Sequence, residues 1–299
     1  MKKMLLLVTY LLFSGCTLTS LMARGSTNHK ITILDQCTLS YEVRQKIPFS
    51  EISDLAYNPK THQLYMIGDK GYLYAFRASF SQKIDQLDYL HGYNIKHHPD
   101  SEGLTFGKRG KLFISFEGSP RISEISQKGE ILQNLKLPKK LRHKKSYKNS
   151  NSIFEALAYH PRYGLLTAAE HPINRGKNRL QTIYSLNGKV WHFMMEPYPN
   201  GAITAMEVMD DNNLLVIERA YNGLSKPFVV TLKKIYLNRC NSKDFCKSQL
   251  IASFSSAEGW GYNNFEGLTK VGKNRYIMVS DNNKRAIFPT LLLYFKVNP

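Results

Sequence analysis

Residues 265–281 read FEGLTKVGKNRYIMVSD, and the chain repeats this phrase, with variations, five times. The other copies are ISDLAYNPKTHQLYMIGD (residues 52–69), SEGLTFGKRGKLFISFE (101–117), FEALAYHPRYGLLTAAE (154–170) and ITAMEVMDDNNLLVIE (203–218). Successive copies start 49 to 62 residues apart. A repeat of this period is typical of propellers and other arrays, in which each unit buries its apolar face only against its neighbours.

Each copy has the pattern of a β-hairpin. Short apolar runs such as LYMI (residues 64–67) and YIMVS (276–280) end each copy, and turn residues such as Asn58 and Pro59 separate them from the run before. Two further β-rich runs follow in most units, for instance residues 180–186 and 189–195. Four strands per unit are the composition of a propeller blade.

The last copy is followed by only one more run, at residues 291–297, and so provides three strands. The run at residues 31–43 can supply the fourth, which would close the ring by pairing the first and last segments. The sequence therefore predicts an all-β fold, a β-propeller with five blades that is closed by its N-terminal strand. Six blades stay possible if residues 238–264 contain an unrecognised unit.

Residues 1–15 resemble the signal peptide of a bacterial lipoprotein. Two lysines precede an apolar run that is too short to span a bilayer as a helix, and Ser and Gly precede Cys16. We expect a lipid on Cys16 and a tether over residues 16–29, with ordinary signal cleavage nearby as the alternative. The resemblance to lipoprotein sorting signals, with Thr17 in place of Asp, favours the outer membrane facing the periplasm. Residues 30–299 then form a single propeller domain.

Three cysteines lie beyond Cys16. In an oxidising compartment, Cys240 and Cys246 can close a small disulfide around the loop NSKDF, which leaves Cys37 as an odd thiol.

The chain carries a formal net charge of +18, and its densest basic stretch is residues 139–148. Such a run is usually a solvated loop. Its functional interpretation is attraction to anions such as lipid headgroups or phosphorylated substrates. Export and the lack of a recognition motif argue against nucleic acid as a partner.

Alignment of the copies on the Leu or Met three residues in places acids at two recurring positions. The second position reads Ser53, Glu102, Glu155, Thr204 and Glu266, and the last position reads Asp69, Glu117, Glu170, Glu218 and Asp281. The start of the first strand and the end of the second strand of a hairpin lie at the same end. We therefore expect both sets at one mouth of the central channel, with Ser53 and Thr204 as small hydrogen-bonding spacers.

Clustered carboxylates of this kind need either raised pKa values or a cation to neutralise them. Carboxylate oxygens are hard ligands that suit a divalent cation such as calcium. We expect the last-position acids to be the metal ligands: Asp69, Glu117, Glu170, Glu218 and Asp281. The second-position acids Glu102, Glu155 and Glu266 are the candidate catalytic residues.

Arginines accompany two of the acids. Arg121 follows Glu117 by four residues, and Arg219 follows Glu218 directly. An arginine can pair with a carboxylate and also bind the phosphate of an anionic substrate. The alternative is that these pairs only hold the channel mouth together.

Four groups of phrases resemble a known family. SEGLTF with FEGSPRI, FEALAYHP with LLTAAE, LLVIERAY, and FEGLTKVGKNRYIMVSDNN are similar, in this order, to the "esterase-like activity of phytase" family of secreted and lipid-anchored propellers. The resemblance implies phosphodiesterase or esterase chemistry at Glu102, Glu117, Glu155, Glu170, Glu218, Glu266 and Asp281. One departure is Asp54, which stands where the family commonly has Gly and could intrude beside the ring.

Three functions follow as hypotheses. The first is a calcium-supported phosphoesterase in which Glu102 or Glu266 positions or deprotonates water and Arg121 and Arg219 hold the phosphate. The second is a non-catalytic propeller that binds a cell-envelope ligand or protein. The third is lactone or sugar-acid chemistry. Because propellers have many unrelated functions, fold alone does not choose among them.

Overall fold

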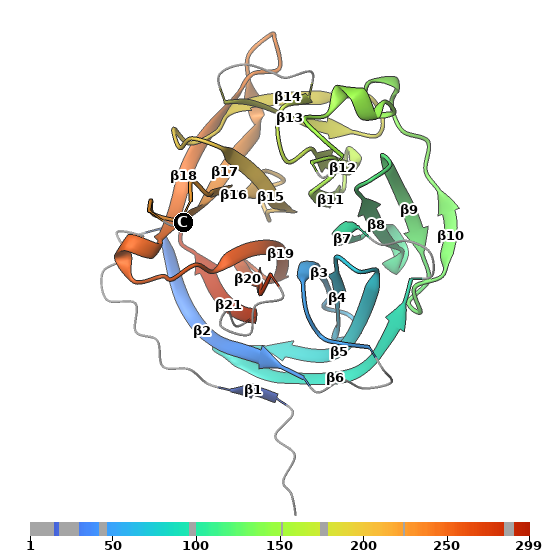
Figure 1. Ribbon diagram of the computed structural model, residues 1–299, viewed down its shortest axis with the longest axis vertical. Helices are drawn as coiled ribbons and strands as arrows, with labels where there is room; N and C mark the ends of the chain where they lie inside the picture. The colour runs from blue at the N-terminus through green and yellow to red at the C-terminus, as the bar shows by residue number, and fades with distance from the viewer. Residues whose placement is uncertain are drawn as a thin grey trace, which may run out of the picture.

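The computed structural model describes residues 15–17, 30–41, 47–95, 100–150, 152–173, 179–223, 225–283 and 290–299. Five antiparallel sheets stand around a central axis (Figure 1). The predicted all-β, five-bladed propeller is confirmed. The expected signal peptide lies outside the described residues apart from Gly15, and so do residues 18–29 of the tether.

Four of the blades are four-stranded sheets, and the first strand of each lies nearest the axis. The first blade contains β3 (Ile52–Asn58), β4 (Gln63–Gly68), β5 (Tyr72–Phe80) and β6 (Ile84–Asn94). The second contains β7 (Ser101–Phe106), β8 (Leu112–Phe116), β9 (Arg121–Ile125) and β10 (Ile131–Asn134). The third contains β11 (Ala156–His160), β12 (Gly164–Ala168), β13 (Leu180–Ser185) and β14 (Val190–Met194). The fourth contains β15 (Gly201–Val208), β16 (Leu214–Ala220), β17 (Val229–Cys240) and β18 (Cys246–Ser255).

The fifth blade joins the two ends of the chain. It contains β19 (Asn264–Gly272), β20 (Arg275–Asp281), β21 (Thr290–Val297), β2 (Ile31–Ser40) and, outermost, β1 (Gly15–Thr17). The antiparallel register between β2 and β21 runs from Ile31 opposite Val297 to Leu39 opposite Thr290. The predicted closure by the N-terminal strand is therefore confirmed. Residues 238–263 belong to the fourth blade and the loop after it, and residue 264 begins β19, which accounts for the stretch that a sixth blade would have needed.

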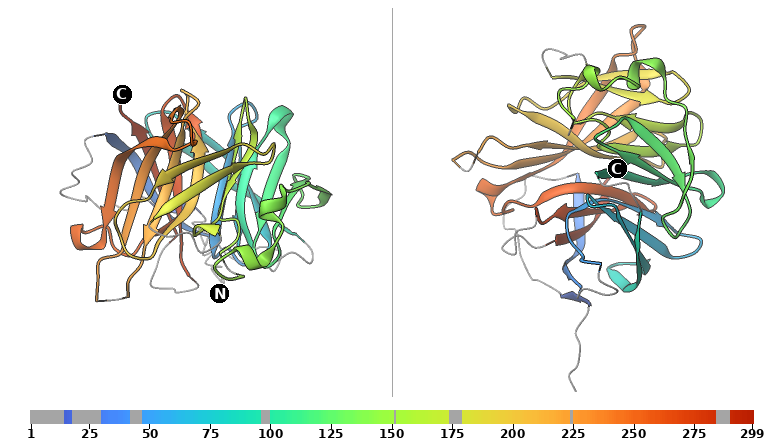
Figure 2. Two further views of the ribbon diagram at one scale, coloured as in Figure 1. Left: turned by 90° about the horizontal axis from the view of Figure 1, so that it is seen from above. Right: turned by 45° about the vertical axis from the view of Figure 1, so that its right-hand side comes forward.

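Helical structure in the described residues is limited to short 3-10 turns. They are η1 (Lys108–Gly110), η2 (Lys139–Leu141), η3 (Lys144–Ser146) and η5 (Ser256–Glu258). Within those residues, no helix has the length and apolar character needed to cross a membrane. The left view of Figure 2, turned by 90° from Figure 1, shows the strands running from one face of the ring to the other.

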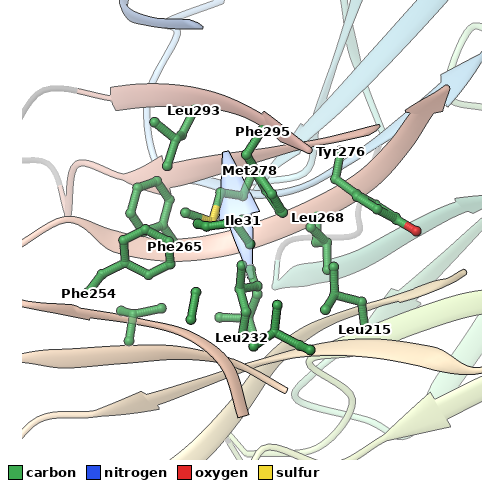
Figure 3. Close-up of a cluster of buried hydrophobic side chains, with 14 of the residues drawn as sticks. Ile31, Leu215, Leu232, Phe254, Phe265, Leu268, Tyr276, Met278, Leu293 and Phe295 are labelled. Carbon is green, nitrogen blue, oxygen red and sulfur yellow. The ribbon is translucent and has the colours of Figure 1, made fainter. Parts of the chain in front are cut away.

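Apolar side chains between neighbouring blades form the core. One cluster joins the fourth and fifth blades through residues such as Leu232, Phe254, Phe265 and Met278 (Figure 3). Because both faces of a blade pack against neighbours, its inner strands are buried along their length rather than alternately, and every residue of β8 is buried. Burial of each large apolar side chain contributes about 1.5–3 kcal/mol to this packing.

The inner strands β3, β7, β11, β15 and β19 contact one another in turn around the axis. Asp54 ties three of them together. Its carboxyl accepts backbone N–H bonds from Leu104 at 2.7 Å in the second blade and from Leu268 at 3.2 Å in the fifth, besides Leu55 at 2.8 Å. Asp54 is only 2 % exposed, and burial raises its pKa. Asp54 therefore links blades inside the ring, and the expectation that it intrudes beside the mouth is wrong.

The cysteines differ in part from expectation. A disulfide joins Cys240 and Cys246 across the β17–β18 hairpin. Cys37 is also disulfide-bonded, so the odd free thiol expected at this position is not present.

Candidate active site at the channel mouth

The second-position residues lie at the axis because four of the five inner strands are irregular there. The ladder shifts at Ser53, Glu102, Thr204 and Glu266, while Glu155 directly precedes β11. A β-bulge re-aims a side chain that regular pairing would turn into the sheet. The repeated bulge explains how second-position side chains come together from different blades.

The two spacers make local hydrogen bonds. The hydroxyl of Thr204 donates to the carbonyl of Phe265 at 2.9 Å, and Ser53 is hydrogen-bonded to the carboxyl of Glu102. Both contacts cross from one blade to another. They agree with the interpretation of these residues as hydrogen-bonding spacers.

The acids Glu102, Glu117, Glu155, Glu170, Glu266, Asp69 and Asp281 gather at this mouth. Glu102 is close enough to Glu117, Glu266 and Asp69 for their charges to affect its ionisation. Burial first, and then these neighbouring acids, raise the pKa of Glu102 well above its ordinary value. The convergence expected from the hairpin geometry is thus present for seven acids.

Glu218 is the exception. The register pairs Ile203 with Glu218 as it pairs Phe265 with Ser280, so Glu218 is equivalent to Ser280 rather than to Asp281. Arg219, one residue later, holds the position of the terminal acid. Placing Glu218 in the ring was therefore an error of one residue. Counting 17 residues per copy, as in 154–170 and 265–281, would have found Arg219.

Glu218 instead lies between the third and fourth blades. It accepts the backbone N–H of Glu196 at 2.8 Å and lies 3.2 Å from Nζ of Lys233, whose side chain is only 2 % exposed. Lys233 also pairs with Glu196 at 2.8 Å. Glu218 is therefore part of a buried ion-pair group and not of the proposed metal-ligand set.

Arg219 connects acids from two other blades. Its Nη2 lies 2.8 Å from Glu170 Oε1 in the third blade, and its Nη1 lies 2.7 Å from Glu266 Oε1 in the fifth. Nη1 also donates to Asn264 Oδ1 at 2.9 Å. Arg219 is the central cation of the mouth.

Around Glu170 there are three further polar residues. Ser152 donates to Glu170 Oε2 at 2.6 Å, and His171 Nε2 lies 3.4 Å from the same oxygen. Burial lowers the pKa of His171, so the ring is neutral at neutral pH. We assign the proton to Nδ1, which donates to Gly201 O, since Nε2 faces the ammonium of Lys148 at 3.1 Å. Lys148 ends the basic stretch 139–148, for which the sequence suggested attraction to anions, whereas Ser152 carried no sequence signal. Both come from the irregular connection between two blades.

Glu117 and Glu155 form a carboxyl pair. Their side chains are hydrogen-bonded to each other, and Glu117 Oε1 also accepts the Ile153 N–H at 3.1 Å. Burial and the neighbouring acids Glu102 and Glu170 raise the pKa of Glu155 well above its ordinary value. Two carboxyl groups that are hydrogen-bonded to each other cannot both ionise readily. Protonated Glu155 therefore donates to Glu117.

Two acids of the fifth blade also hold protons more tightly than usual. Burial raises the pKa of Glu266 to about 8, although Arg219 opposes the shift. Burial likewise raises the pKa of Asp281 to about 6. Asp69 forms an ion pair with Lys70 at 2.9 Å. The mouth therefore contains carboxyls that hold protons and carboxyls that pair with cations.

Arg121 starts β9, one strand outward from Glu117. Its guanidinium lies 4.1 Å from the centre of the Phe116 ring, and burial lowers its pKa. Arg121 therefore lies beside the mouth on an aromatic face, whereas Arg219 is inside the carboxyl network.

A cavity of about 720 Å³ opens beside this network, above the third, fourth and fifth blades. Its walls include Lys148, Glu170, His171, Arg219 and Asn264, together with three aromatic residues that come from loops. A volume of this size suits a small-molecule ligand. The two cations make one wall suitable for an anion.

Carboxyl oxygens are the type of ligand that calcium prefers. The mouth also contains more acids than cations, which favours binding of a positive ion. Their arrangement is less favourable. Throughout the part of the chain that is described, no three Asp, Glu, His or Cys side chains are already placed to hold one metal ion. Binding would require the carboxyls to release protons and move together.

Fold and site together define the class of protein: a five-bladed β-propeller with a carboxyl network around one arginine at its channel mouth. Residues 47–284 match the Phytase-like family, described as "Esterase-like activity of phytase". The match covers most of the chain, and the protein belongs to this family.

Solved structures with a related fold are distant in sequence. Virginiamycin B lyase from Staphylococcus aureus has 10 % identity and a TM-score of 0.43, with 95 % of this chain and 98 % of that chain covered. The PQQ-bound aldose sugar dehydrogenase from Streptomyces coelicolor has 10 % identity and a TM-score of 0.45, with coverages of 90 % and 98 %. Similarity at this level supports no inference about activity. The comparison with curated proteins finds no match.

Proposed function

We propose that the protein hydrolyses phosphoesters at the channel mouth. The observation that carries this proposal is the cavity in which Arg219 and Lys148 lie beside Glu170 and, through Arg219, next to Glu266. Phosphoryl transfer needs cations to neutralise the phosphate and groups that move protons. Both kinds of group meet here.

Arg219 and Lys148 bind the phosphate in this proposal. Contacts with described residues occupy three of the five N–H donors of Arg219, so its guanidinium still has donors for a phosphate oxygen. The Lys148 side chain is exposed and lies against neutral His171, which leaves its charge available to an anion. Arg121, on its aromatic face farther out, serves as a secondary contact.

The acids divide the proton transfers between them. Glu170 takes a proton from water as the water oxygen attacks phosphorus. Glu266 has a pKa of about 8 and is therefore largely protonated at neutral pH, so it gives a proton to the leaving oxygen as the P–O bond breaks. Glu102 and the Glu117–Glu155 pair maintain the charge balance behind them.

A divalent cation, calcium in the first instance, belongs to the proposal as a supporting group. Glu102, Glu117 and Glu155 would hold it, with Asp69 and Asp281 nearby, and it would add positive charge next to the phosphate when bound. The export signal, the lipid on Cys16 and the outer-membrane location are proposed with it, because the N-terminal sequence resembles that of a lipoprotein.

The test is an assay of purified protein on a panel of phosphomonoesters and phosphodiesters, with calcium and with a chelator. Glu266→Gln and Glu170→Gln should each lower kcat by about 10²–10⁴, the usual contribution of a general acid or base. Glu102→Gln should also lower it. Glu130→Gln is the matched control, since Glu130 lies at the β9–β10 turn. Lack of turnover on the whole panel, or full activity in both Glu266→Gln and Glu170→Gln, would refute the proposal.

The second candidate is a binding propeller without turnover. The observation in its favour is that Arg219 already contacts two acids, Glu170 and Glu266, as a purely structural cation would. Saturable binding of a phosphate compound without any hydrolysis would support this candidate over the first.

A further inference from the structure

Two kinds of side chain line the cavity beside Arg219. The first group, called here the charged wall, contains Lys148, His171, Arg219 and Glu170, which is paired with Arg219; the second, the aromatic wall, contains Tyr221, Phe228 and Tyr262. Asn200, Asn264 and Asn283 also line it. A bare phosphate would contact only the charged wall, so the aromatic wall is available to contact the rest of a larger ligand.

The aromatic wall is built from loops at the ends of strands. Tyr221 follows β16, Phe228 precedes β17, and Tyr262 lies two residues before β19. The Phe228 ring centre lies 6.1 Å from that of Tyr221 and 6.1 Å from that of Tyr262, so the three rings form a continuous surface.

Tyr221 is the accessible end of this surface. It is 49 % exposed, whereas Phe228 beneath it is 6 % exposed. The Phe228 ring packs against the Tyr221 ring in a tilted arrangement, and both rings line the cavity. A planar aromatic group can stack on such a tyrosine, and a stack of this kind typically changes affinity about tenfold.

The charged wall and the aromatic wall meet within one cavity of about 720 Å³, which is large enough for a phosphate and a ring system together. The exposed amides of Asn200 and Asn283 can hydrogen-bond polar groups between the two ends. The cavity therefore matches a ligand that is anionic at one end and aromatic at the other.

We infer that the substrate is a phosphoester of an aromatic group, bound with its phosphate at Arg219 and Lys148 and its ring on Tyr221. That this ligand is a substrate rests on the proposed function, whereas its binding mode can be measured without turnover. The same chemistry occurs in nucleotides and in simple aryl phosphates.

Titration calorimetry with four compounds tests the binding mode. AMP is compared with ribose 5-phosphate, in which a hydroxyl replaces the base, and phenylphosphonate with methylphosphonate, in which a methyl group replaces the ring. We expect the aromatic member of each pair to bind about tenfold more tightly. Tighter binding of AMP than of phenylphosphonate would identify a nucleotide site, and the reverse an aryl phosphate site.

Tyr221→Ala should remove the preference for the aromatic member, and Tyr221→Phe should retain it. Tyr198→Ala is the matched control, because Tyr198 is also exposed, at 37 %, but lines the neighbouring cavity with Pro197 and Pro199. Equal affinity within both pairs, or an unchanged preference in Tyr221→Ala, would overturn the inference. Hydrolysis without aromatic preference would contradict this inference alone. Aromatic preference without hydrolysis would contradict only the proposed function.

Discussion

Arg219 and Glu170 occupy equivalent positions in neighbouring blades, and their side chains form an ion pair of 2.8 Å. One repeat position thus provides the cation that neutralises the acid of the adjacent repeat. The same arginine reaches Glu266 at 2.7 Å, so one substitution of acid by base connects three blades.

Replacing Arg219 should destabilise the fold. Arg219→Met leaves Glu170 and Glu266 without their cation in a largely buried site, where removal of one partner costs about 3–5 kcal/mol. Chemical denaturation at pH 8 measures the change, with exposed Arg162→Met as the control. A loss under about 1 kcal/mol would show that the pair is effectively at the surface.

Stability should fall as the pH rises. The pKa of Glu266 is about 8 in the fold and 4.5 as its ordinary value, so the folded state binds its proton more tightly than the unfolded state. This contribution is complete below about pH 4.5 and is lost as the pH rises through about 8. The Tm of chelator-treated protein should therefore fall between pH 5 and 8. Glu266→Gln should flatten the profile, and an identical slope in that variant would contradict the assignment.

Calcium should stabilise the protein more at pH 8 than at pH 5. A cation that binds only the folded state raises Tm by mass action, and protons on Glu102 and Glu155 compete with it at low pH. Scanning calorimetry of metal-stripped protein at both pH values measures the effect. No shift at pH 8 with millimolar calcium, magnesium or manganese would eliminate the proposed cation.

Asp54→Ala should weaken the ring itself. The change leaves the buried N–H groups of Leu104 and Leu268 without an acceptor, at about 1–3 kcal/mol each. Asp54→Asn should cost less, because one oxygen still accepts from Leu268 and Leu55. Urea unfolding ranks the variants, with exposed Asp88→Ala as the control. Equal stability of wild type and Asp54→Ala would disprove the linking role.

Cys16 should carry the lipid in the mature protein, and Cys16→Ser should release the protein from membranes. Fractionation and mass spectrometry of the N-terminal peptide measure both outcomes. A lipidated sulfur cannot also form a disulfide, whereas Cys37 is disulfide-bonded in the structure. The prediction therefore requires that Cys37 of the mature protein has no bond to Cys16, and a peptide in which Cys16 is cross-linked to Cys37 would contradict it.

Much of the fold could be predicted from the sequence, because strand periodicity and turn residues act over a few positions. The five hairpin phrases located the inner strands, and the run beginning at Ile31 matched the missing fourth strand of the last blade. The acids of the mouth followed from the same repeat. Glu218 was assigned to the mouth wrongly, because the copies were aligned by residue type at their last position and not by the number of residues in the hairpin.

The position of Glu218 illustrates what the sequence by itself determined and what only the tertiary structure decided. The sequence determined the repeat and the end of the ring where acids gather, and it favoured five blades over six. Strand register decided that Arg219 and not Glu218 faces the mouth, since side chains alternate along a strand and a shift of one residue turns each to the other face. Loop packing then brought Lys148 and Tyr221 to one cavity, because contacts between distant segments depend on the closed ring and on no local pattern.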